Sequence, residues 1–248
     1  MKDQVDRIRA AYRSDIIKFV EEEFGVTLET YQRRVLLDFA NTELSRRKDV
    51  MKSSAGVGKS ATLAWCMLWF IFVFDFAQGV ALSMTLDNLR DGLWKEVNYW
   101  LYKSELLSYF FDMNQKRLFN KQYDKTWFIS ARTYDKKADR ARSGEILSGL
   151  HSGHLGYFID EAGGIFPEVG KSIEQGFGEK SATFVRAIFA GNPMDKDSLL
   201  YKETKDESNF VIGITSDHAS PISLSAPRPI SHLSAATDPD HQDHSLSL

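Results

Sequence analysis

The sequence has one cysteine and almost no net charge, and each shortage excludes a class of protein. Because Cys66 is the only cysteine among 248 residues, no intrachain disulfide and no cysteine-based zinc site can form, which suits a reducing compartment. The 31 basic and 34 acidic residues leave a formal charge of -3, so the surface as a whole is not built to coat a polyanion. Any contact with nucleic acid must therefore be local.

No apolar run is long enough to span a membrane. The longest, from Ala61 to Phe74, reads ATLAWCMLWFIFVF and stops at Asp75, short of the roughly 20 residues that a membrane helix needs. The N-terminal stretch MKDQVDRIRAAYRSD lacks the continuous apolar segment of a signal peptide. We therefore expect a helix buried in a core, and no membrane partner.

Strand and helix signals alternate over residues 1–215, which is typical of one α/β domain with a parallel sheet covered on both faces. Periodic apolar positions predict helices over 15–24, 30–47 and 86–102, and the apolar run predicts one from about residue 59. Short apolar segments predict six strands, over 49–53, 79–85, 126–131, 155–160, 183–191 and 209–215.

The composition changes at Ser216, after which Ser, Pro, His and Asp dominate and no periodic apolar pattern remains. We expect residues 216–248 to form an irregular, disordered tail. Four of the six histidines lie in this range, but their scattered spacing favours a solvated tail over a metal site. They are His218, His232, His241 and His244.

The strongest chemical signal lies between the first predicted strand and the apolar helix. Residues 53–60 read SSAGVGKS, which follows the phosphate-binding pattern G-x-x-x-x-G-K-[ST] except that Ser53 replaces the first glycine. The glycines allow successive backbone N–H groups to surround an anion at the mouth of a helix, whose dipole also favours phosphate. Lys59 is expected to bridge the β- and γ-phosphates of ATP, and the Ser60 hydroxyl to ligate Mg²⁺. The expected nucleotide-binding residues of this loop are Ser54, Ala55, Gly56, Val57, Gly58, Lys59, Ser60 and Ala61.

Two adjacent carboxylates, Asp160 and Glu161, follow the apolar segment LGYFI. Beside a phosphate loop, Asp160 is expected to hold the magnesium ion through water, and Glu161 to polarise the attacking water. Phosphoryl transfer requires positioning and charge stabilisation more than covalent work by the protein, so one carboxylate for each task suffices. The sequence therefore predicts Mg²⁺-dependent ATP hydrolysis.

A polar amide, Asn192, follows the next predicted strand in the segment FAGNP. Ligands of parallel sheets bind outside the carboxyl ends of the strands. We expect Asn192 to bond the γ-phosphate or the attacking water and so to report hydrolysis to the rest of the domain. Taken alone, an Asn-Pro pair is only a turn signal.

In this order the segments resemble the ATPase motor domain of the large terminase subunit of tailed bacteriophages. The resemblance covers roughly residues 25–215, and it implies a three-layer, additional-strand, RecA-like P-loop NTPase with a mostly parallel sheet. It also implies that Gln32 recognises adenine and that Asn192 belongs to a coupling motif. Its specific parts are Tyr31-Gln32, the phosphate loop, LSGLHSGHLGYFIDEAGGI at 147–165, and AGNP at 190–193 followed by Tyr201.

That family drives viral double-stranded DNA into a procapsid by ATP hydrolysis, and it cuts the DNA with a C-terminal nuclease domain. The resemblance implies a homo-oligomeric ring at the capsid portal, with the portal protein and the small terminase subunit as partners, in the cytoplasm of a bacterial host. Two alternatives remain: a P-loop DNA helicase or translocase, and a non-catalytic nucleotide-gated assembly protein. The Asp160-Glu161 pair argues against the second.

The sequence departs from the family where an arginine is frequent. Ser54 and Ala55 occupy the available places in the phosphate loop, and Ser148-Gly149 stands ahead of the acidic strand. The arginine finger that a neighbouring subunit supplies is therefore unassigned.

The segment KKADRARSGE offers two candidates for this finger, Arg140 and Arg142, with Arg132 behind them. A guanidinium suits the charge that develops on the γ-phosphoryl group. The alternatives for the segment are a solvated basic loop and a contact with DNA backbone phosphates.

The family's nuclease domain has no counterpart in the sequence. Such a domain needs a cluster of Asp or Glu that holds two metals, and no acidic strand follows Thr215. We expect the chain to lack nuclease activity. The abrupt change at Ser216 suggests that a reading-frame change or an altered chain end supplies the later residues, a hypothesis that fails if the other frames after codon 216 hold no terminase-like continuation.

Overall fold

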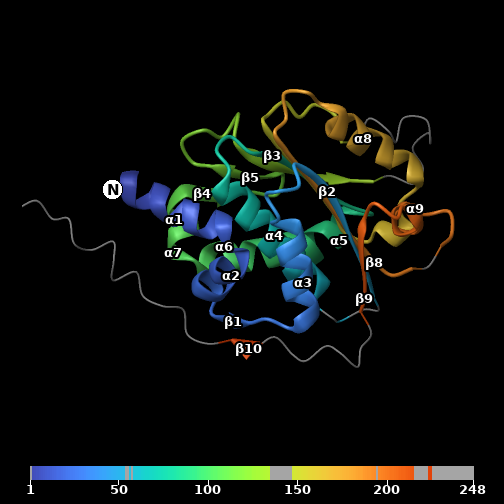
Figure 1. The fold of residues 1–248 in the computed structure, drawn as a ribbon, viewed down its shortest axis with the longest axis horizontal. Coiled ribbons are helices and arrows are strands. Elements are labelled where there is room, and N and C mark those ends of the chain that lie inside the picture. Colours follow the sequence, from blue (N-terminus) through green and yellow to red (C-terminus); the bar gives the residue numbers. More distant parts are fainter. Residues whose placement is uncertain are drawn as a thin grey trace, which may run out of the picture.

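One eight-stranded sheet forms the centre of the molecule, and helices cover both of its faces (Figure 1). The computed structural model describes residues 2–53, 56, 58–134, 147–193, 195–214 and 223–224. In the order in which they lie in the sheet, the strands are β4 (Phe111–Met113), β5 (Arg117–Asn120), β6 (Phe128–Thr133), β3 (Gln78–Ser83), β7 (His154–Ile159), β8 (Phe184–Gly191), β2 (Arg46–Ser53) and β9 (Phe210–Ile214). The pairing is parallel from β6 through β9, whereas β4 and β5 are antiparallel.

The six parallel strands are the six that the sequence predicts, with small shifts at their ends. The two antiparallel strands were not predicted, because three or four residues are too few to show a period of two. β8 lies between β2, which leads to the phosphate loop, and β7, which leads to the acidic pair. This order confirms the predicted additional-strand fold with a mostly parallel sheet.

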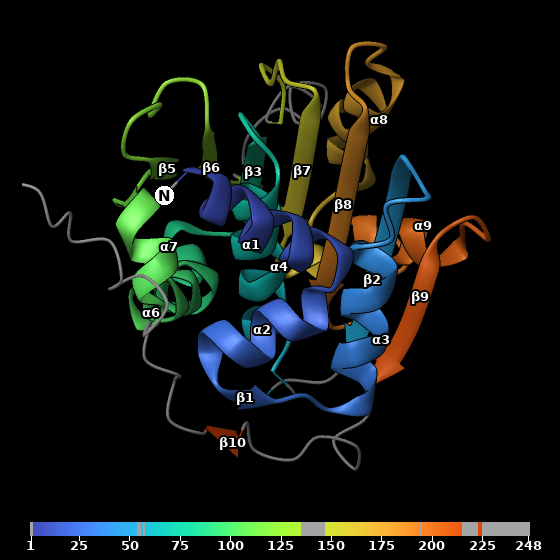
Figure 2. The same cartoon turned by 60° about the vertical axis from the view of Figure 1, so that its left-hand side comes forward.

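The helices divide between the two faces (Figure 2). One face carries α1 (Lys2–Ser14), α2 (Ile16–Phe24), α3 (Thr30–Phe39), α4 (Lys59–Val73) and α6 (Lys95–Lys103), with α7 (Glu105–Phe110) beside them. The other face carries α8 (Gly170–Gly178) and α9 (Leu199–Lys205). After β3, the short helix α5 (Leu86–Asn88) and the π-helical turn η1 (Leu89–Trp94) lead into α6. After β7, two 3₁₀ turns, η3 (Ala162–Gly164) and η4 (Pro167–Val169), lead into α8.

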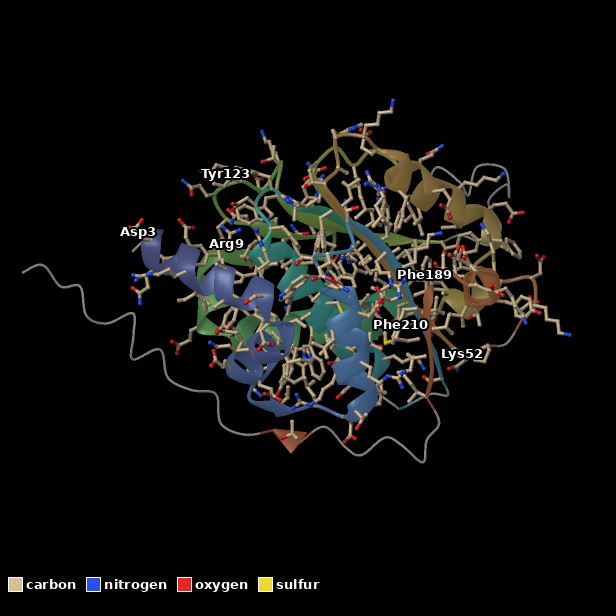
Figure 3. The ribbon with its side chains drawn as sticks, in the orientation of Figure 1. Asp3, Arg9, Lys52, Tyr123, Phe189 and Phe210 are labelled. Atoms are coloured by element: carbon tan, nitrogen blue, oxygen red, sulfur yellow. The ribbon has the colours of Figure 1, made fainter. Side chains whose placement is uncertain are left out.

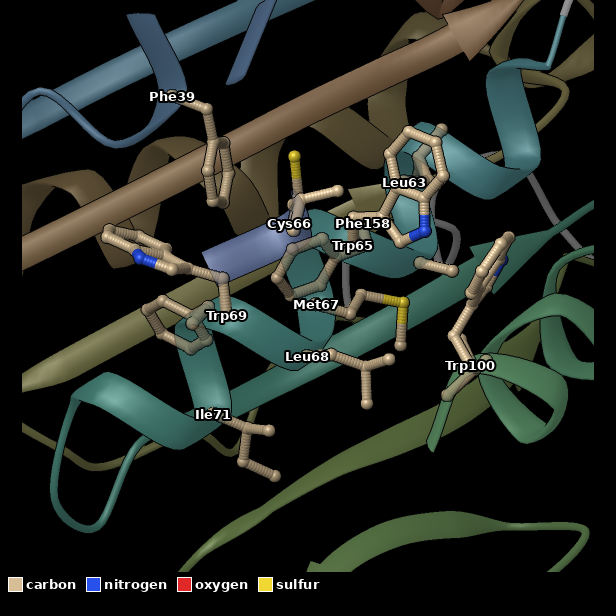
Figure 4. Close-up of a cluster of buried hydrophobic side chains, with 14 of the residues drawn as sticks. Phe39, Leu63, Trp65, Cys66, Met67, Leu68, Trp69, Ile71, Trp100 and Phe158 are labelled. Atoms are coloured by element: carbon tan, nitrogen blue, oxygen red, sulfur yellow. The ribbon is translucent and has the colours of Figure 1, made fainter. Parts of the chain in front are cut away.

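The apolar run forms the central core helix, as predicted. Every residue of α4 from Ala61 to Val73 is buried, and its aromatic rings pack against other elements of the same face (Figure 4). The ring centroids of Trp65 and Trp100 are 5.4 Å apart, and those of Trp69 and Phe39 are 6.0 Å apart. None of the helices among the described residues combines the length and apolarity needed to cross a membrane.

The helix predicted over 30–47 ends at Phe39, so its second half was predicted wrongly. Arg186 of β8 is fully buried, and its guanidinium donates to the carbonyls of Phe39 and Leu44, each at 2.6 Å, and to that of Asn41. Carbonyls that a side chain binds in this way are not available to continue a helix. The chain then enters β2 at Arg46, three residues before the predicted start of this strand at Asp49.

The first helix, α1, had no clear signal in the sequence. Arg9, labelled in Figure 3, fixes it to the end of α4: its Nε donates to the carbonyl of Phe72 at 2.7 Å, and its guanidinium lies 5.2 Å from the ring centre of Trp127. Arg9 is therefore one of the charged residues that obscure the helical pattern of α1 in the sequence, and it also helps to fix α1 to the core.

A separate pair of short strands joins the segment after α2 to the last described residues. β1 (Val26–Thr27) pairs antiparallel with β10 (Ser223–Leu224). The sequence carries no signal for this pairing. The rest of 216–248, where we expect an irregular tail, lies outside the described residues.

Candidate active site

A cavity of about 610 Å³ opens at the carboxyl ends of β2, β7 and β8. Lys52 of β2 lies beside Gly191 of β8, and Ile159 of β7 beside Phe189, so the segments after these strands emerge next to one another. The lining residues are Gly56, Gly58, Lys59, Ser60, Ala61, Met84, Asn88, Gly92, Glu96, Asp160, Glu161, Gly163, Gly164, Gly191 and Asn192.

The phosphate loop has the backbone that its glycines allow. Gly56 and Gly58 are left-handed, with φ of 79° and 81°, and Gly58 immediately precedes α4. A Cβ at Gly56 meets nothing within 4 Å, so the backbone conformation and not lack of space calls for glycine there. The remaining loop residues of the prediction, Ser54, Ala55 and Val57, lie outside the described residues.

Lys59 projects from the first turn of α4 toward β2 and β8. Its Nζ donates to the Ser53 hydroxyl at 2.9 Å, to the Ser53 carbonyl at 3.3 Å and to the Asn192 Oδ1 at 3.2 Å. The serine that replaces the first glycine of the motif thus supplies a bond to the lysine. Burial lowers the pKa of Lys59, while the carboxylates of Asp160 and Glu161 act in the opposite direction.

Ser60 and Asp160 face each other across the floor of the cavity. The Ser60 hydroxyl lies 3.5 Å from Asp160 Oδ2, a distance at the limit of a hydrogen bond. Asp160 is 5% exposed, and burial raises its pKa to about 6, although the backbone N–H of Glu161 and the charge of Lys59 favour the ionised form. A buried carboxylate of this kind gains from a cation that replaces its lost hydration.

Glu161 has left-handed backbone, with φ of 53°, at the start of η3. Its carboxylate accepts a hydrogen bond from the side-chain amide of Asn88. Two glycines make the turn possible: a Cβ at Gly163 lies 1.9 Å from the Asn192 carbonyl oxygen, and one at Gly164 lies 2.2 Å from Met84 Sδ. The contact at Gly163 is with backbone, so the acidic turn packs directly on the end of β8, whereas the contact at Gly164 is with the flexible side chain of Met84.

The other predicted site residues have different surroundings. Gln32 is 1% exposed in the first turn of α3, where its Oε1 accepts from the backbone N–H of Glu29 at 2.9 Å, and it is not among the cavity-lining residues. Arg132, in β6, is half-buried and donates to the Ser148 carbonyl at 3.0 Å. Arg140 and Arg142 lie outside the described residues.

Sequence reasoning missed one wall of the cavity. Asn88, Gly92 and Glu96 line it at intervals of four residues, so one face of the segment from α5 to α6 points into the site. Gly92 interrupts this segment, with φ of -100° and ψ of -105°. Sequence reasoning overlooked Asn88 and Glu96 because the same stretch carries a strong apolar stripe. Their place directly after β3, a strand that neighbours β7, is the signal that could have found them.

The arrangement can hold a triphosphate and direct water at its end. Backbone amides and Lys59 supply positive charge, and an oxygen from each of Ser60 and Asp160 can serve a cation. Beyond Ser60 and Asp160, the Glu161 carboxylate supplies hydrogen-bond acceptors, and the Asn192 amide supplies both a donor and an acceptor. The described residues contain no group of three or more His, Cys, Asp or Glu that could hold a metal ion.

No model of a known protein family matches the chain. In sequence, it is 28% identical over 160 residues to a probable terminase large subunit of Enterobacteria phage P7, a match that covers 63% of this chain and 31% of that protein. The chain therefore spans about a third of this relative.

Three solved structures share the fold. The HK97 bacteriophage large terminase matches with a TM-score of 0.58 and 12% identity, over 82% of this chain and 43% of that one. The ATPase domain of the Thermus phage P74-26 large terminase matches with a TM-score of 0.51 and 15% identity, over 80% and 84%. The large terminase of the thermophilic bacteriophage D6E, solved in complex with ADP, matches with a TM-score of 0.53 and 14% identity, over 77% and 46%. The resemblance to the ATPase domain of terminase large subunits is thus confirmed, in sequence by the phage P7 relative and in fold by these structures.

Proposed function

We propose that this chain is the Mg²⁺-dependent ATPase domain of a DNA-packaging terminase large subunit. The observation that carries the proposal is the meeting of Lys59, Asn192 and the Asp160-Glu161 pair around one cavity, at the ends of three adjacent strands. The similarity to a probable terminase large subunit supports the packaging role.

Binding begins at the phosphate loop. The N–H groups around Gly56 and Gly58 and the start of α4 attract the phosphates, and Lys59 exchanges its bonds to Ser53 and Asn192 for phosphate oxygens. The exchange is favourable because a charged oxygen is a stronger acceptor than the neutral ones it replaces. We propose that the first turn of α3, with Gln32, recognises the adenine.

Ser60 and Asp160 fit a magnesium ion, since both present oxygen atoms to the cavity and the Asp160 carboxylate is buried away from the water that would otherwise solvate its charge. Bound there, Mg²⁺ would neutralise phosphate charge. The chain's own part is to hold the Ser60 hydroxyl and the Asp160 carboxylate close together at the cavity, 3.5 Å apart.

Hydrolysis depends on the residues beyond the metal position. Glu161 accepts a hydrogen bond from the attacking water, and its carboxylate takes the proton as the water oxygen bonds to the γ-phosphorus and the bond from that phosphorus to the β-phosphate oxygen breaks, which releases ADP. Asn192 is released when Lys59 turns to phosphate, which leaves its amide available for the γ-phosphate or the water. Because the Asn192 carbonyl packs on Gly163, a shift of this residue is transmitted to the acidic turn.

The wider assembly completes the proposal. We propose that the domain acts on double-stranded DNA within a homo-oligomeric ring at the capsid portal, beside the small terminase subunit, in the cytoplasm of the bacterial host. Arg140 or Arg142 then serves as the finger that enters a neighbour's site. Alone, the chain is expected to be a weak ATPase.

Two variants test the ATPase. Glu161→Gln should retain nucleotide affinity while phosphate release falls by at least about 100-fold, because only the group that polarises water is lost. Lys59→Ala should weaken nucleotide binding as well. Both effects are measured by titration with a fluorescent ATP analogue and by phosphate release in Mg²⁺. Equal turnover by the wild type and Glu161→Gln contradicts the proposal, and stimulation by free duplex but not by portal protein favours a helicase-like translocase.

A further inference from the structure

We propose that Asn88 is a positioning residue for hydrolysis, which holds the Glu161 carboxylate in place through its side-chain amide. The inference rests on the proposed role of Glu161 and extends it to the helical segment after β3. Asn88 acts through Glu161 and does not itself touch the reacting atoms.

The contact joins two segments that are 73 residues apart in sequence. Asn88 Nδ2 donates to Glu161 Oε2, and among the described residues this is the one side-chain hydrogen bond of that carboxylate. Glu161 is otherwise exposed to the cavity. An untethered glutamate samples many rotamers, whereas the bond to Oε2 restricts the side chain and leaves Oε1 to accept from water.

Asn88 is itself firmly held. Its backbone N–H donates to the Thr85 hydroxyl at 3.1 Å, and the next residue, Leu89, is buried and donates to the Thr85 carbonyl at 3.0 Å. Thr85 therefore fixes the start of α5. Because its backbone is fixed in this way, the Asn88 side chain can reach few positions, as a positioning residue requires.

The two segments are also fixed relative to each other. β3 and β7 are parallel neighbours, and the backbone N–H of Asp160 donates to the Leu82 carbonyl at 2.8 Å, at the point where both strands end. Met84 fills the space above Gly164, so the turn after β3 and the acidic turn pack together. The distance from Asn88 to Glu161 is thus set by the sheet.

The chemistry of the amide suits this task. An asparagine donates to a carboxylate without bringing a charge, so it orients Glu161 without forming an ion pair. A lysine or arginine in its place would pair with the carboxylate and compete with its contact to water, and an aspartate repels it. The same segment passes near Asp160 at Gly92, where an added Cβ would lie 3.9 Å from Asp160 Oδ2.

The test compares variants of the full chain in single-turnover hydrolysis of ATP with Mg²⁺, alongside nucleotide affinity. Asn88→Ala should lower the hydrolysis rate by about 10- to 100-fold with the dissociation constant of a fluorescent ATP analogue changed less than about twofold, because positioning and not binding is lost. Asn88→Asp has the same shape without the donor, and it should be slower still. Asn98→Ala is the matched control, since Asn98 is an exposed asparagine on the same helical segment outside the cavity, and it should match the wild type.

A spectroscopic measurement makes the test independent of turnover. In protein labelled with [¹⁵N]asparagine, the side-chain amide signal that Asn88→Ala removes should shift in Glu161→Gln and stay in place in Asn98→Ala. Wild-type hydrolysis by Asn88→Ala and Asn88→Asp, or an amide signal indifferent to Glu161→Gln, overturns the positioning role while the proposed ATPase stands. Wild-type hydrolysis by Glu161→Gln instead overturns the proposed function itself.

Discussion

Glycines set how closely the acidic turn approaches the strand that carries Asn192. A Cβ at Gly163 lies 1.9 Å from the Asn192 carbonyl oxygen, and a Cβ at Gly191 lies 2.9 Å from the Gly163 backbone nitrogen. Since both contacts are with backbone, no rotamer change relieves them. Asn192 and Glu161, which we propose to act in hydrolysis, are therefore held close together by residues that have no side chain.

Gly163→Ala should separate these groups. We expect a loss of about 2 kcal/mol in the free energy of unfolding, because backbone has to move, and a drop in ATP turnover of at least tenfold because Asn192 and Glu161 are displaced. Gly178→Ala is the control: nothing lies within 4 Å of a Cβ there, so it should be neutral or slightly stabilising. Urea unfolding and phosphate release measure both variants, and wild-type behaviour of Gly163→Ala contradicts the close packing.

Asp160 makes a different residue-scale contribution, since its burial costs stability. Its pKa is about 6 in the folded chain against 3.8 for an unperturbed aspartate. The folded state therefore binds this proton more tightly than the unfolded state does. The resulting cost is absent below the unfolded value and fully present above pH 6, where it is on the order of 3 kcal/mol.

Asp160→Asn should therefore stabilise the protein when nucleotide and metal are absent. Unfolding in urea with EDTA should show the gain at pH 7.5 and a much smaller one at pH 4.5, because the wild-type carboxyl is then largely protonated in the folded chain. The variant should also lose Mg²⁺-dependent ATPase activity. An equal gain at the two pH values means that the stabilisation has another cause.

At the scale of elements, the sheet was predictable and the connections were not. The inner strands β3, β7 and β8 are buried along almost their whole length and so carry mostly apolar runs, such as LGYFI in β7. The end of α3 depends on Arg186, which is 147 residues from the Phe39 carbonyl that it binds. A local pattern cannot contain such a contact, and the prediction accordingly ran through Asn41 and Leu44.

The same division applies to the candidate site. Lys59, Ser60, Asp160, Glu161 and Asn192 were named from the sequence because strand ends and a glycine-rich loop mark them, and all five line one cavity. The wall from α5 to α6 was not foreseen, since its contribution depends on which strand lies beside β7. That neighbour is set by the order of strands in the sheet, which the sequence does not display.

Arg186 offers an element-scale prediction. Arg186→Met should destabilise the chain by about 3 to 5 kcal/mol, because it leaves the carbonyls after α3 without donors and removes a positive charge near the buried Asp49. Arg46→Met is a comparison at a more exposed arginine that also binds backbone carbonyls, and it should cost less. Denaturant unfolding followed by circular dichroism measures both, and equal losses contradict the importance of burial.

At the scale of the whole molecule, the proposed ring predicts that one subunit completes the site of the next. The charge that develops on the γ-phosphoryl group in hydrolysis is commonly stabilised by an arginine. Among the described residues, Lys59 lines the cavity and no arginine does. If the proposed ring forms with head-to-tail contacts, we expect a neighbour to bring Arg140 or Arg142 to each site.

A mixing experiment tests this arrangement directly. The Arg140→Ala/Arg142→Ala variant keeps an intact cavity, whereas Lys59→Ala keeps intact arginines, and each alone should hydrolyse ATP poorly. Mixed in equal amounts under conditions of ring assembly, they should recover about one quarter of wild-type turnover, because an intact cavity then meets an intact neighbour at one site in four. Adding inactive Lys59→Ala to wild-type protein should not raise ATP turnover by a comparable amount. Activity of the mixture no greater than the sum of its parts excludes these two arginines as groups donated by a neighbour, while full activity of the double variant alone shows that hydrolysis does not need them.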